Sequence, residues 1–317
     1  MIGGSARNPA SSAGYWSQKA DPILTIGAGE VNNSWGRGFY DGSTFHMLYS
    51  YKSGGKDVIG HATASDPEGT WTKDAANNPI LSTGSTGAWD AASVYVSEVW
   101  KEGGTWYVLY MGADAAGNSK IGLASGSSLT SLSKSGSNPV LSADYTWEKS
   151  GSTHLLDCGP VWKVGSTYYF AYGTWMTAIR SVGMATSTNL TSWTKPNSTP
   201  IFTGDRYTCG GFVRGSHYYL MVSHYTAISQ ESDIELWRSL SPEFTNPELV
   251  RIVAPHNPGV SWQAKDFEML SVIASDIEKI TYPNNKLYIL TSGSDVNDVW
   301  SQGLIVESDI DAALEFT

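Results

Sequence analysis

The stretch KEGGTWYVLYMG at residues 101–112 decides the fold, because related stretches recur along the chain. In each of them a tight turn precedes a strand rich in aromatic and aliphatic residues, which is typical of the second strand of a β-hairpin. The other copies are YDGSTFHMLYS (40–50), KVGSTYYFAYGT (163–174), VRGSHYYLMVSH (213–224) and YPNNKLYILTSG (282–293). A period of roughly sixty residues indicates a repeat architecture.

Two further strands are predicted after each hairpin. The third-strand segments carry alternating or continuous apolar residues; they are DVIGHATAS (57–65), SKIGLASGS (119–127), RSVGMATST (180–188), DIELWRSLS (233–241) and SQGLIVESD (301–309). Pro79, Pro139 and Pro200 each precede a short apolar run. Proline fits an outer edge strand, where the backbone can spare an N–H group, so each unit is expected to have four strands.

The two ends of the chain indicate how the units are arranged. The stretch YWSQKADPIL at 15–24 resembles a fourth strand, whereas the last unit lacks one. We therefore expect an all-β, single-domain five-bladed β-propeller over 1–317, closed by 15–24 joining the last blade. The expected blades span approximately 30–82, 90–142, 154–203, 205–255 and 266–317. An open β-solenoid is the alternative, and it leaves the exchange of end strands unexplained.

Composition supports the fold class and narrows the partners. Charged residues make up 16% of the chain, beside 33 Gly, 13 Trp and 17 Tyr, a balance that favours strands and turns over surface helices. A net charge of -10 without a basic cluster argues against nucleic acid as a partner. No apolar run is long enough for a membrane span, and the first residues lack signal-peptide features. We expect a soluble protein with no membrane partner; an extracellular or virion-associated location and the oligomeric state stay open.

The predicted channel mouth collects acidic side chains. Innermost strands begin, and second strands end, on one face of a propeller, so Asp157 in HLLDCGPVW (154–162), Asp90 and Glu30 are expected there. Facing carboxylates raise one another's pKa, and such clusters are candidate functional sites. Each acid also has a structural alternative, namely a turn or cap bonded to backbone amides. Residues expected to contact a substrate are Trp35, Arg37, Trp89, His154, Trp175, Arg206 and His224.

The blade pattern and the motif DCGP at 157–160 resemble the five-bladed β-propeller glycoside hydrolases, the arabinanases, β-xylosidases, levansucrases and invertases of the family 43 and 32 type. Their third-blade general acid lies in EGP or ECP, so the resemblance implies that Asp157 is the proton donor, with Asp in place of Glu. It assigns the base or nucleophile to Asp90 or Glu30. The Asp-Pro that opens the first inner strand in those enzymes is replaced here by WGRGF (35–39).

Two functions follow from this reading. The first is a glycoside hydrolase acting on a polysaccharide or oligosaccharide by paired-carboxylate catalysis. The second is a non-catalytic carbohydrate-binding propeller, such as an adhesin or virion surface module. No His-x-His or HExxH spacing predicts a catalytic metal, so no cofactor is expected to be required; a structural cation in the central channel is compatible with the resemblance.

Overall fold

The computed structural model describes residues 16–28, 30–175, 180–225, 232–254, 266–277, 286–295, 297 and 299–307. Within these ranges the chain is all-β, as the sequence predicts, and helix is confined to the short 3₁₀ elements η1 (Leu129–Ser131) and η2 (Thr146–Glu148). The predicted fourth-strand segment 15–24 begins one residue before the described part of the chain.

The strands form successive antiparallel units. The first contains β2 (Asn33–Tyr40), β3 (Phe45–Ser53), β4 (Lys56–Ala64) and β5 (Thr72–Lys73). The second contains β6 (Ser93–Glu102), β7 (Thr105–Ala113), β8 (Ser119–Gly126) and β9 (Ser133–Lys134). The third contains β12 (Leu156–Asp157), β13 (Val161–Val164), β14 (Thr167–Thr174) and β15 (Val182–Ser187), preceded by the hairpin β10 (Lys149–Ser150) and β11 (Thr153–His154).

The last two units follow the same order. The fourth contains β16 (Arg206–Arg214), β17 (His217–Tyr225), β18 (Ser232–Ser239) and β19 (Glu248–Ala254). The fifth contains β20 (Asp266–Val272), β21 (Leu287–Ser294) and β22 (Trp300–Glu307), and its outer strand is β1 (Trp16–Gln18) from the other end of the chain. Strand β1 runs antiparallel to β22, with Trp16 opposite Glu307.

The apolar runs after the predicted edge prolines pair as expected for fourth strands. Leu81, Leu141 and Phe202 each form an antiparallel bridge with the third strand of their own unit. Leu24, which follows Pro22, forms the same kind of bridge with Gln302. The N-terminal segment therefore occupies in the fifth unit the place that these runs occupy in the first three.

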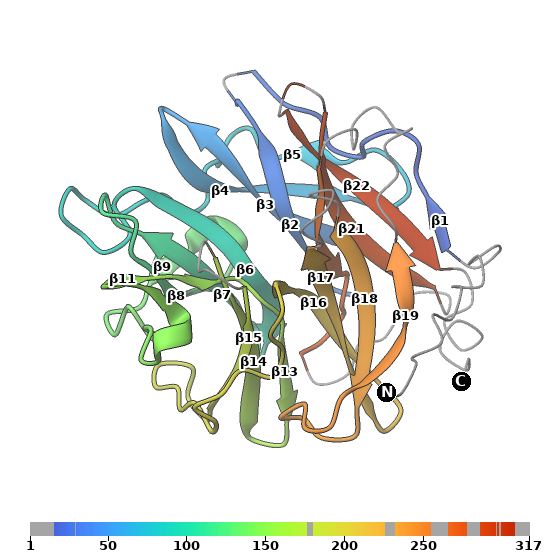
Figure 1. Cartoon of the computed structure of the whole chain (residues 1–317). Helices are drawn as coiled ribbons and strands as arrows, with labels where there is room; N and C mark the ends of the chain where they lie inside the picture. The colour runs from blue at the N-terminus through green and yellow to red at the C-terminus, as the bar shows by residue number, and fades with distance from the viewer. Residues whose placement is uncertain are drawn as a thin grey trace.

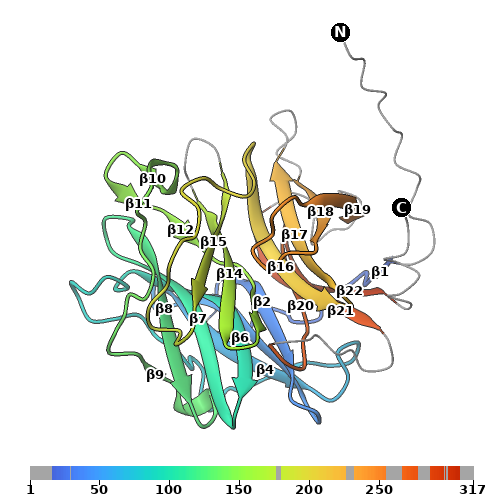
Figure 2. The same cartoon turned by 90° about the horizontal axis from the view of Figure 1, so that it is seen from below.

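Figure 1 shows how the units are arranged. Strands β2, β6 and β16 lie toward the middle of the molecule, while β1, β9 and β19 lie toward its periphery. Figure 2 shows β10, β11 and β12 on one face and β9 on the opposite face. The inner strands of neighbouring units contact one another, so residues of several units can meet there.

The core lies between neighbouring sheets. Strand β7 buries Val108, Leu109 and Tyr110 completely, because its aromatic and aliphatic residues pack on both faces of the sheet. Each such side chain contributes about 1.5 to 3 kcal/mol when it is removed from water. One cluster of buried residues spans the first three units and reaches Ile277 of the fifth. Separate clusters join the first unit to the fifth and the third unit to the fourth.

Candidate functional site

Asp157 is almost fully buried at the end of β12, with only 1% of its surface exposed. Its backbone lies opposite Gly173 of β14, and its Oδ1 accepts a hydrogen bond of 2.6 Å from the N–H of Cys158. Burial raises the pKa of Asp157, while that N–H group and the charges of Arg37 and Arg180 act in the opposite direction. A carboxyl in this environment holds its proton at a higher pH than an exposed aspartate does.

Gly159 of the DCGP motif allows the segment that carries Asp157 to pack closely against β14. A Cβ at Gly159 would lie 1.8 Å from the carbonyl oxygen of Ala171, so only glycine allows this close approach to β14. The N–H of Gly159 donates to Ser97 Oγ (3.0 Å), and the same hydroxyl donates to the Gly159 carbonyl (3.1 Å). The motif is therefore held by strands of both the second and third units.

Arg37 of the first unit acts electrostatically on Glu98 of the second unit and on Asp157 of the third. It lies on β2 after a bulge and is 1% exposed, and its charge lowers the pKa of both Glu98 and Asp157. Burial has the larger effect on Glu98 and raises its pKa to about 7. Glu98 also borders a cavity of about 20 Å³, room for one water molecule. Two acids thus share the field of one arginine.

Two aromatic side chains, which we call the aromatic wall, meet where the first two units adjoin. The rings of Trp35 and Tyr95 meet edge to face with centroids 4.0 Å apart. Trp35 has a φ of 55°, a left-handed conformation rare for such a bulky residue, and its N–H donates to Ser292 Oγ (2.9 Å). The hydroxyl of Tyr95 donates to Asp57 Oδ2 at 2.7 Å. Strained residues of this kind cluster at functional sites.

A second group of side chains comes from the third and fourth units and is centred on Arg180. The Arg180 guanidinium lies 5.3 Å from the centre of the Trp175 ring and donates to Asp205 Oδ1 at 2.9 Å. Its charge also lowers the pKa of Asp157. Trp175 and Arg37, both predicted to contact a substrate, are thus associated with Asp157, directly or through Arg180.

Glu30 and Asp90 bind lysines within their own units. Asp90 Oδ2 lies 2.5 Å from Lys134 Nζ and accepts a hydrogen bond of 3.2 Å from the Tyr110 hydroxyl. Glu30 pairs in the same way with a lysine and a tyrosine, and so does Glu148 of the third unit. We call these sets the lysine–carboxylate–tyrosine clusters; they are Glu30, Lys73 and Tyr49; Asp90, Lys134 and Tyr110; and Glu148, Lys195 and Tyr172.

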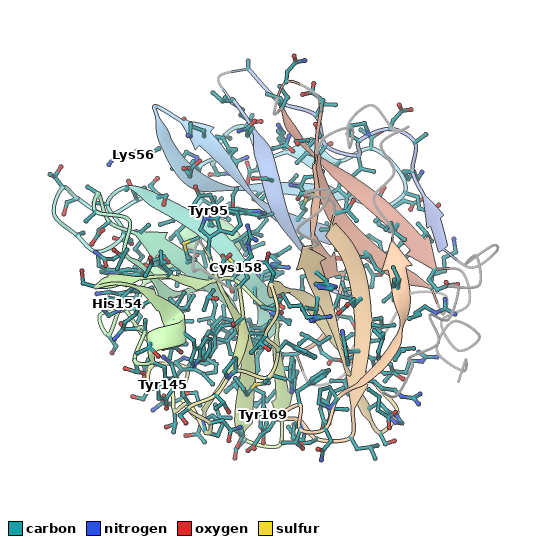
Figure 3. The ribbon with its side chains drawn as sticks, viewed as in Figure 1. Lys56, Tyr95, Tyr145, His154, Cys158 and Tyr169 are labelled. Atoms are coloured by element: carbon teal, nitrogen blue, oxygen red, sulfur yellow. The ribbon has the colours of Figure 1, made fainter. Side chains whose placement is uncertain are left out.

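Trp89 and His154 lie in two different surroundings. The ring of Trp89 stacks on Tyr110 with centroids 5.7 Å apart, so it belongs beside the second cluster. His154 lies on β11, where its N–H donates to Asn118 Oδ1 (3.0 Å). Figure 3 shows His154 toward the outer side of the molecule, apart from Cys158 and Tyr95, which lie nearer the middle. The structure therefore does not bring His154 to Asp157.

Arg206 and His224 converge on Glu235 of β18. Arg206 donates to both carboxylate oxygens of Glu235, at 2.8 and 3.0 Å, and His224 Nδ1 lies 3.0 Å from Oε1. Trp237 Nε1 donates to the same carboxylate at 2.8 Å. Burial acts to raise the pKa of Glu235, but Arg206 and these partners outweigh it and the pKa is lowered. Glu235 is thus the anion that holds both predicted residues in the fourth unit.

Sequence reasoning did not select Tyr95, Asp57 and Arg180. Tyr95 interrupts the apolar alternation of β6 with a hydroxyl, which is a local signal, but its contact with Asp57 is a tertiary one. Across the described ranges, no group of three His, Cys, Asp or Glu side chains is placed to hold a metal ion. In the same ranges no helix has the length and apolarity needed to cross a bilayer.

Comparison with known proteins gives a likeness in fold. No protein-family profile matches the sequence, and no curated protein is significantly similar to it. Among solved structures, the chain resembles the catalytic domain of a GH62 α-L-arabinofuranosidase from Coprinopsis cinerea, with a TM-score of 0.65, 12% identity, and coverage of 93% of this chain and 97% of that chain.

Two other structures resemble it to the same degree. The α-L-arabinofuranosidase PaAbf62A from Podospora anserina has a TM-score of 0.63, 12% identity, and coverage of 92% and 96%. A glycosyl hydrolase from Bacteroides ovatus has a TM-score of 0.66, 13% identity, and coverage of 94% and 95%. At these identities the likeness concerns the fold, which this chain shares with glycoside hydrolases over nearly its whole length.

Proposed function

We propose that the protein is a glycoside hydrolase with Asp157 as its proton donor. The observation that carries this proposal is a buried carboxyl with a raised pKa, near the axis, flanked by the charges of Arg37 and Arg180. Trp35 and Trp175 supply apolar ring faces of the kind that pack against sugars. The shared fold supports the same reaction class, as an analogy.

We infer further that the five units are the blades of one propeller closed by β1. The pairing of β1 with β22 supports closure, because it ties the first described residues to the last. Phe39 of β2 also forms a parallel bridge with Ala274, which joins the inner parts of the first and fifth units. A ring of this kind provides the central site at which Asp157 acts.

The chemistry requires a donor and an acceptor of protons. Asp157 gives its proton to the leaving glycosidic oxygen while a second group acts on the anomeric carbon or on a water, through an oxocarbenium-like transition state. Asp90 and Glu30 are the acids that the sequence assigns to this second role. Each is now seen in an ion pair with a lysine, so this role requires that it act while holding that cation.

The residues that the sequence predicts to contact a substrate are assigned to different parts of the proposed site. Arg37 and Trp175 are assigned to the substrate site because Arg37 acts on the charge of Asp157 and Trp175 packs against Arg180. Trp35 is assigned there because its ring meets that of Tyr95, which lies in the field of Asp157. Trp89, Arg206 and His224 are assigned to the outer part of the substrate site. Trp89 packs on Tyr110, and Arg206 and His224 bind Glu235, so none of them has a contact with Asp157 among the described residues. His154 is proposed only for a long substrate that extends from the axis to β11.

A carbohydrate-binding function without catalysis is the second candidate. The observation that favours it is that Glu30 and Asp90, two of the three predicted catalytic acids, each bind a lysine. In that case the aromatic wall at Trp35 and Tyr95 would bind a glycan and release it without cleaving it.

The test is a panel of 4-nitrophenyl glycosides and soluble plant and microbial polysaccharides, assayed with the wild type and with Asp157→Asn. We expect sugar release by the wild type and a loss of about 10²- to 10⁴-fold in kcat for the variant. Asp66→Asn, on an exposed turn after β4, is the matched control. Release that is equal in the wild type and Asp157→Asn would remove Asp157 from the mechanism, and glycan binding without release would favour the second candidate.

A further inference from the structure

The starting observation is the hydrogen bond between Tyr95 and Asp57, which joins the first two units. Asp57 lies at the start of β4, and its backbone forms the parallel bridge with Ser93 through which β4 meets β6. The Tyr95 hydroxyl donates to Asp57 Oδ2 at 2.7 Å. Both residues lie where β4 and β6 begin, which is the end of the sheet to which β12 also brings Asp157.

The Tyr95 hydroxyl lies in the electrostatic field of Asp157. Burial raises the pKa of Tyr95, the Asp57 carboxylate raises it further, and the charge of Asp157 adds to both effects. Figure 3 shows Tyr95 and Cys158, the neighbour of Asp157, toward the middle of the molecule, with Lys56, the neighbour of Asp57, farther out. Strand β6 also carries Ser97, two residues after Tyr95, and the Ser97 hydroxyl exchanges hydrogen bonds with Gly159, so this strand contacts the segment that contains Asp157.

Asp57 differs from the acids that the sequence selects. Glu30, Asp90 and Glu148 each hold the lysine of their own unit. Among the described residues, Asp57 forms no ion pair with a lysine or arginine, and its side-chain partner is Tyr95. The Asp57 carboxylate therefore faces the Tyr95 hydroxyl that it binds, and no lysine or arginine of the described residues competes for it.

We propose that Tyr95 and Asp57 form the proton-accepting half of the catalytic site opposite Asp157, a proposal that rests on the glycoside hydrolase function above. Tyr95 is the catalytic residue that meets the attacking water, and Asp57 is the positioning residue that receives the proton through it. The pair takes the role of the second catalytic group, because the first inner strand carries WGRGF where the resembling enzymes have an aspartate.

The step balances without a further reactant. The water oxygen bonds to the anomeric carbon as the bond from that carbon to the leaving oxygen breaks, and Asp157 transfers its proton to the leaving oxygen. One water proton passes to Tyr95 Oη as the original Tyr95 proton passes to Asp57 Oδ2. Asp57 ends neutral and Asp157 ends ionised, and exchange with solvent restores both. Because the transfers are concerted, no free phenolate forms, which suits a tyrosine in this environment.

The kinetic test compares Tyr95→Phe and Asp57→Asn with the wild type on the 4-nitrophenyl glycoside that the wild type cleaves fastest. We expect kcat to fall about 10²-fold or more in both variants with KM changed less than about threefold. Sodium azide, a nucleophile that needs no base, is expected to restore the rate of Tyr95→Phe. Tyr107→Phe, a partly exposed tyrosine in the same unit, is the matched control.

Two kinetic results would overturn the proposal. One is a Tyr95→Phe variant with wild-type kcat, and the other is a loss that azide does not relieve, since a structural hydrogen bond would give that pattern. A covalent glycosyl adduct on Tyr95, detected by mass spectrometry after rapid quenching, would also overturn it, because the relay forms no bond between Tyr95 and the sugar.

A second measurement needs no turnover and so separates this proposal from the hydrolase proposal. With tyrosine labelled at ¹³Cζ, the Tyr95 resonance, assigned with Tyr95→Phe, is expected to follow the titration of Asp57 and to shift in Asp157→Asn. A resonance that responds to neither carboxyl would overturn the relay even in an active hydrolase. If the wild type cleaves no glycoside while the resonance responds to both, the hydrolase function fails and the placement of the pair stands.

Discussion

The ammonium group of Lys134 lies 2.5 Å from Oδ2 of Asp90, and this ion pair has counterparts in the neighbouring units. In each cluster the lysine also lies over the ring of the tyrosine that donates to the carboxylate, at 5.3 to 5.5 Å in three measured cases. The third strand passes so close to that ring that it carries a glycine there, Gly60, Gly122 or Gly183. The clusters are thus a repeated means of joining four segments of one unit.

Asp90→Asn tests the structural role of the second cluster. We expect the free energy of unfolding to fall by about 2 to 4 kcal/mol, because Lys134 keeps its charge in a largely buried place without its counterion. Urea denaturation measures the change, and the double variant Asp90→Asn, Lys134→Met is expected to recover part of it. A variant as stable as the wild type that has lost sugar release would instead put Asp90 in the chemistry.

The sequence indicates these clusters only in part. Lys73, Lys134 and Lys195 recur at an interval of about sixty residues within the predicted fourth strands, so their repetition is visible along the chain. The positions of their partners do not repeat, because Glu30, Asp90 and Glu148 lie at unequal distances before the first strands of their units, Glu148 within η2. From sequence alone, an acid before an inner strand can be interpreted either as a catalytic group or as the counterion of a lysine. Only the tertiary contacts distinguish these two interpretations.

The strand order, by contrast, follows from local signals. Turn chemistry and apolar alternation predict each hairpin, and the resemblance of 15–24 to a fourth strand predicts the pairing of β1 with β22. The contact between Tyr95 and Asp57 crosses from one unit to the next, and no periodicity encodes it. Sequence therefore predicts the strands and their order within each unit, while contacts between units require the structure.

Gly159→Ala tests the close approach beside Asp157. The new Cβ would meet the carbonyl oxygen of Ala171 at 1.8 Å, so the backbone must shift, and we expect a loss of about 3 kcal/mol of stability. Gly136→Ala is the control, since no atom lies within 4 Å of the position that its Cβ would take and its φ is ordinary. Thermal unfolding measures both variants. Equal midpoints for the two would contradict the packing of the DCGP segment.

Two histidines of the first unit form a buried chain with two aspartates. His46 Nδ1 lies 3.0 Å from His61 Nε2, His46 Nε2 lies 3.3 Å from Asp41, and His61 Nδ1 lies 3.6 Å from Asp74. The Asp41 and Asp74 carboxylates favour the protonated form of the imidazole beside each, although His46 Nε2 and His61 Nδ1 have no hydrogen-bond partner among the described residues. Burial and the neighbouring imidazole nevertheless lower the pKa of His61 from 6.5 to about 4.

Stability is therefore expected to depend on pH through His61. Between about pH 6.5 and pH 4 the unfolded chain binds a proton that the folded chain resists, so stability is greatest above this window and falls as the pH decreases through it, by about 3 kcal/mol at most. Urea midpoints at pH 7 and pH 4.5 measure the slope. His61→Gln should flatten it; a slope that is unchanged in this variant would assign the effect to other groups.

The last prediction concerns the pH dependence of sugar release. Asp157 must be protonated to donate, so activity is expected to fall as the pH rises through its pKa, which burial holds above the usual value. The Arg180 charge opposes that effect, and its removal in Arg180→Gln should raise the pKa of Asp157 and move the alkaline limb of kcat/KM to higher pH. Arg238→Gln is the control, because Arg238 pairs with Glu248 at an exposed edge. A limb that stays in place or moves to lower pH in Arg180→Gln would show that the limb reports a group other than Asp157.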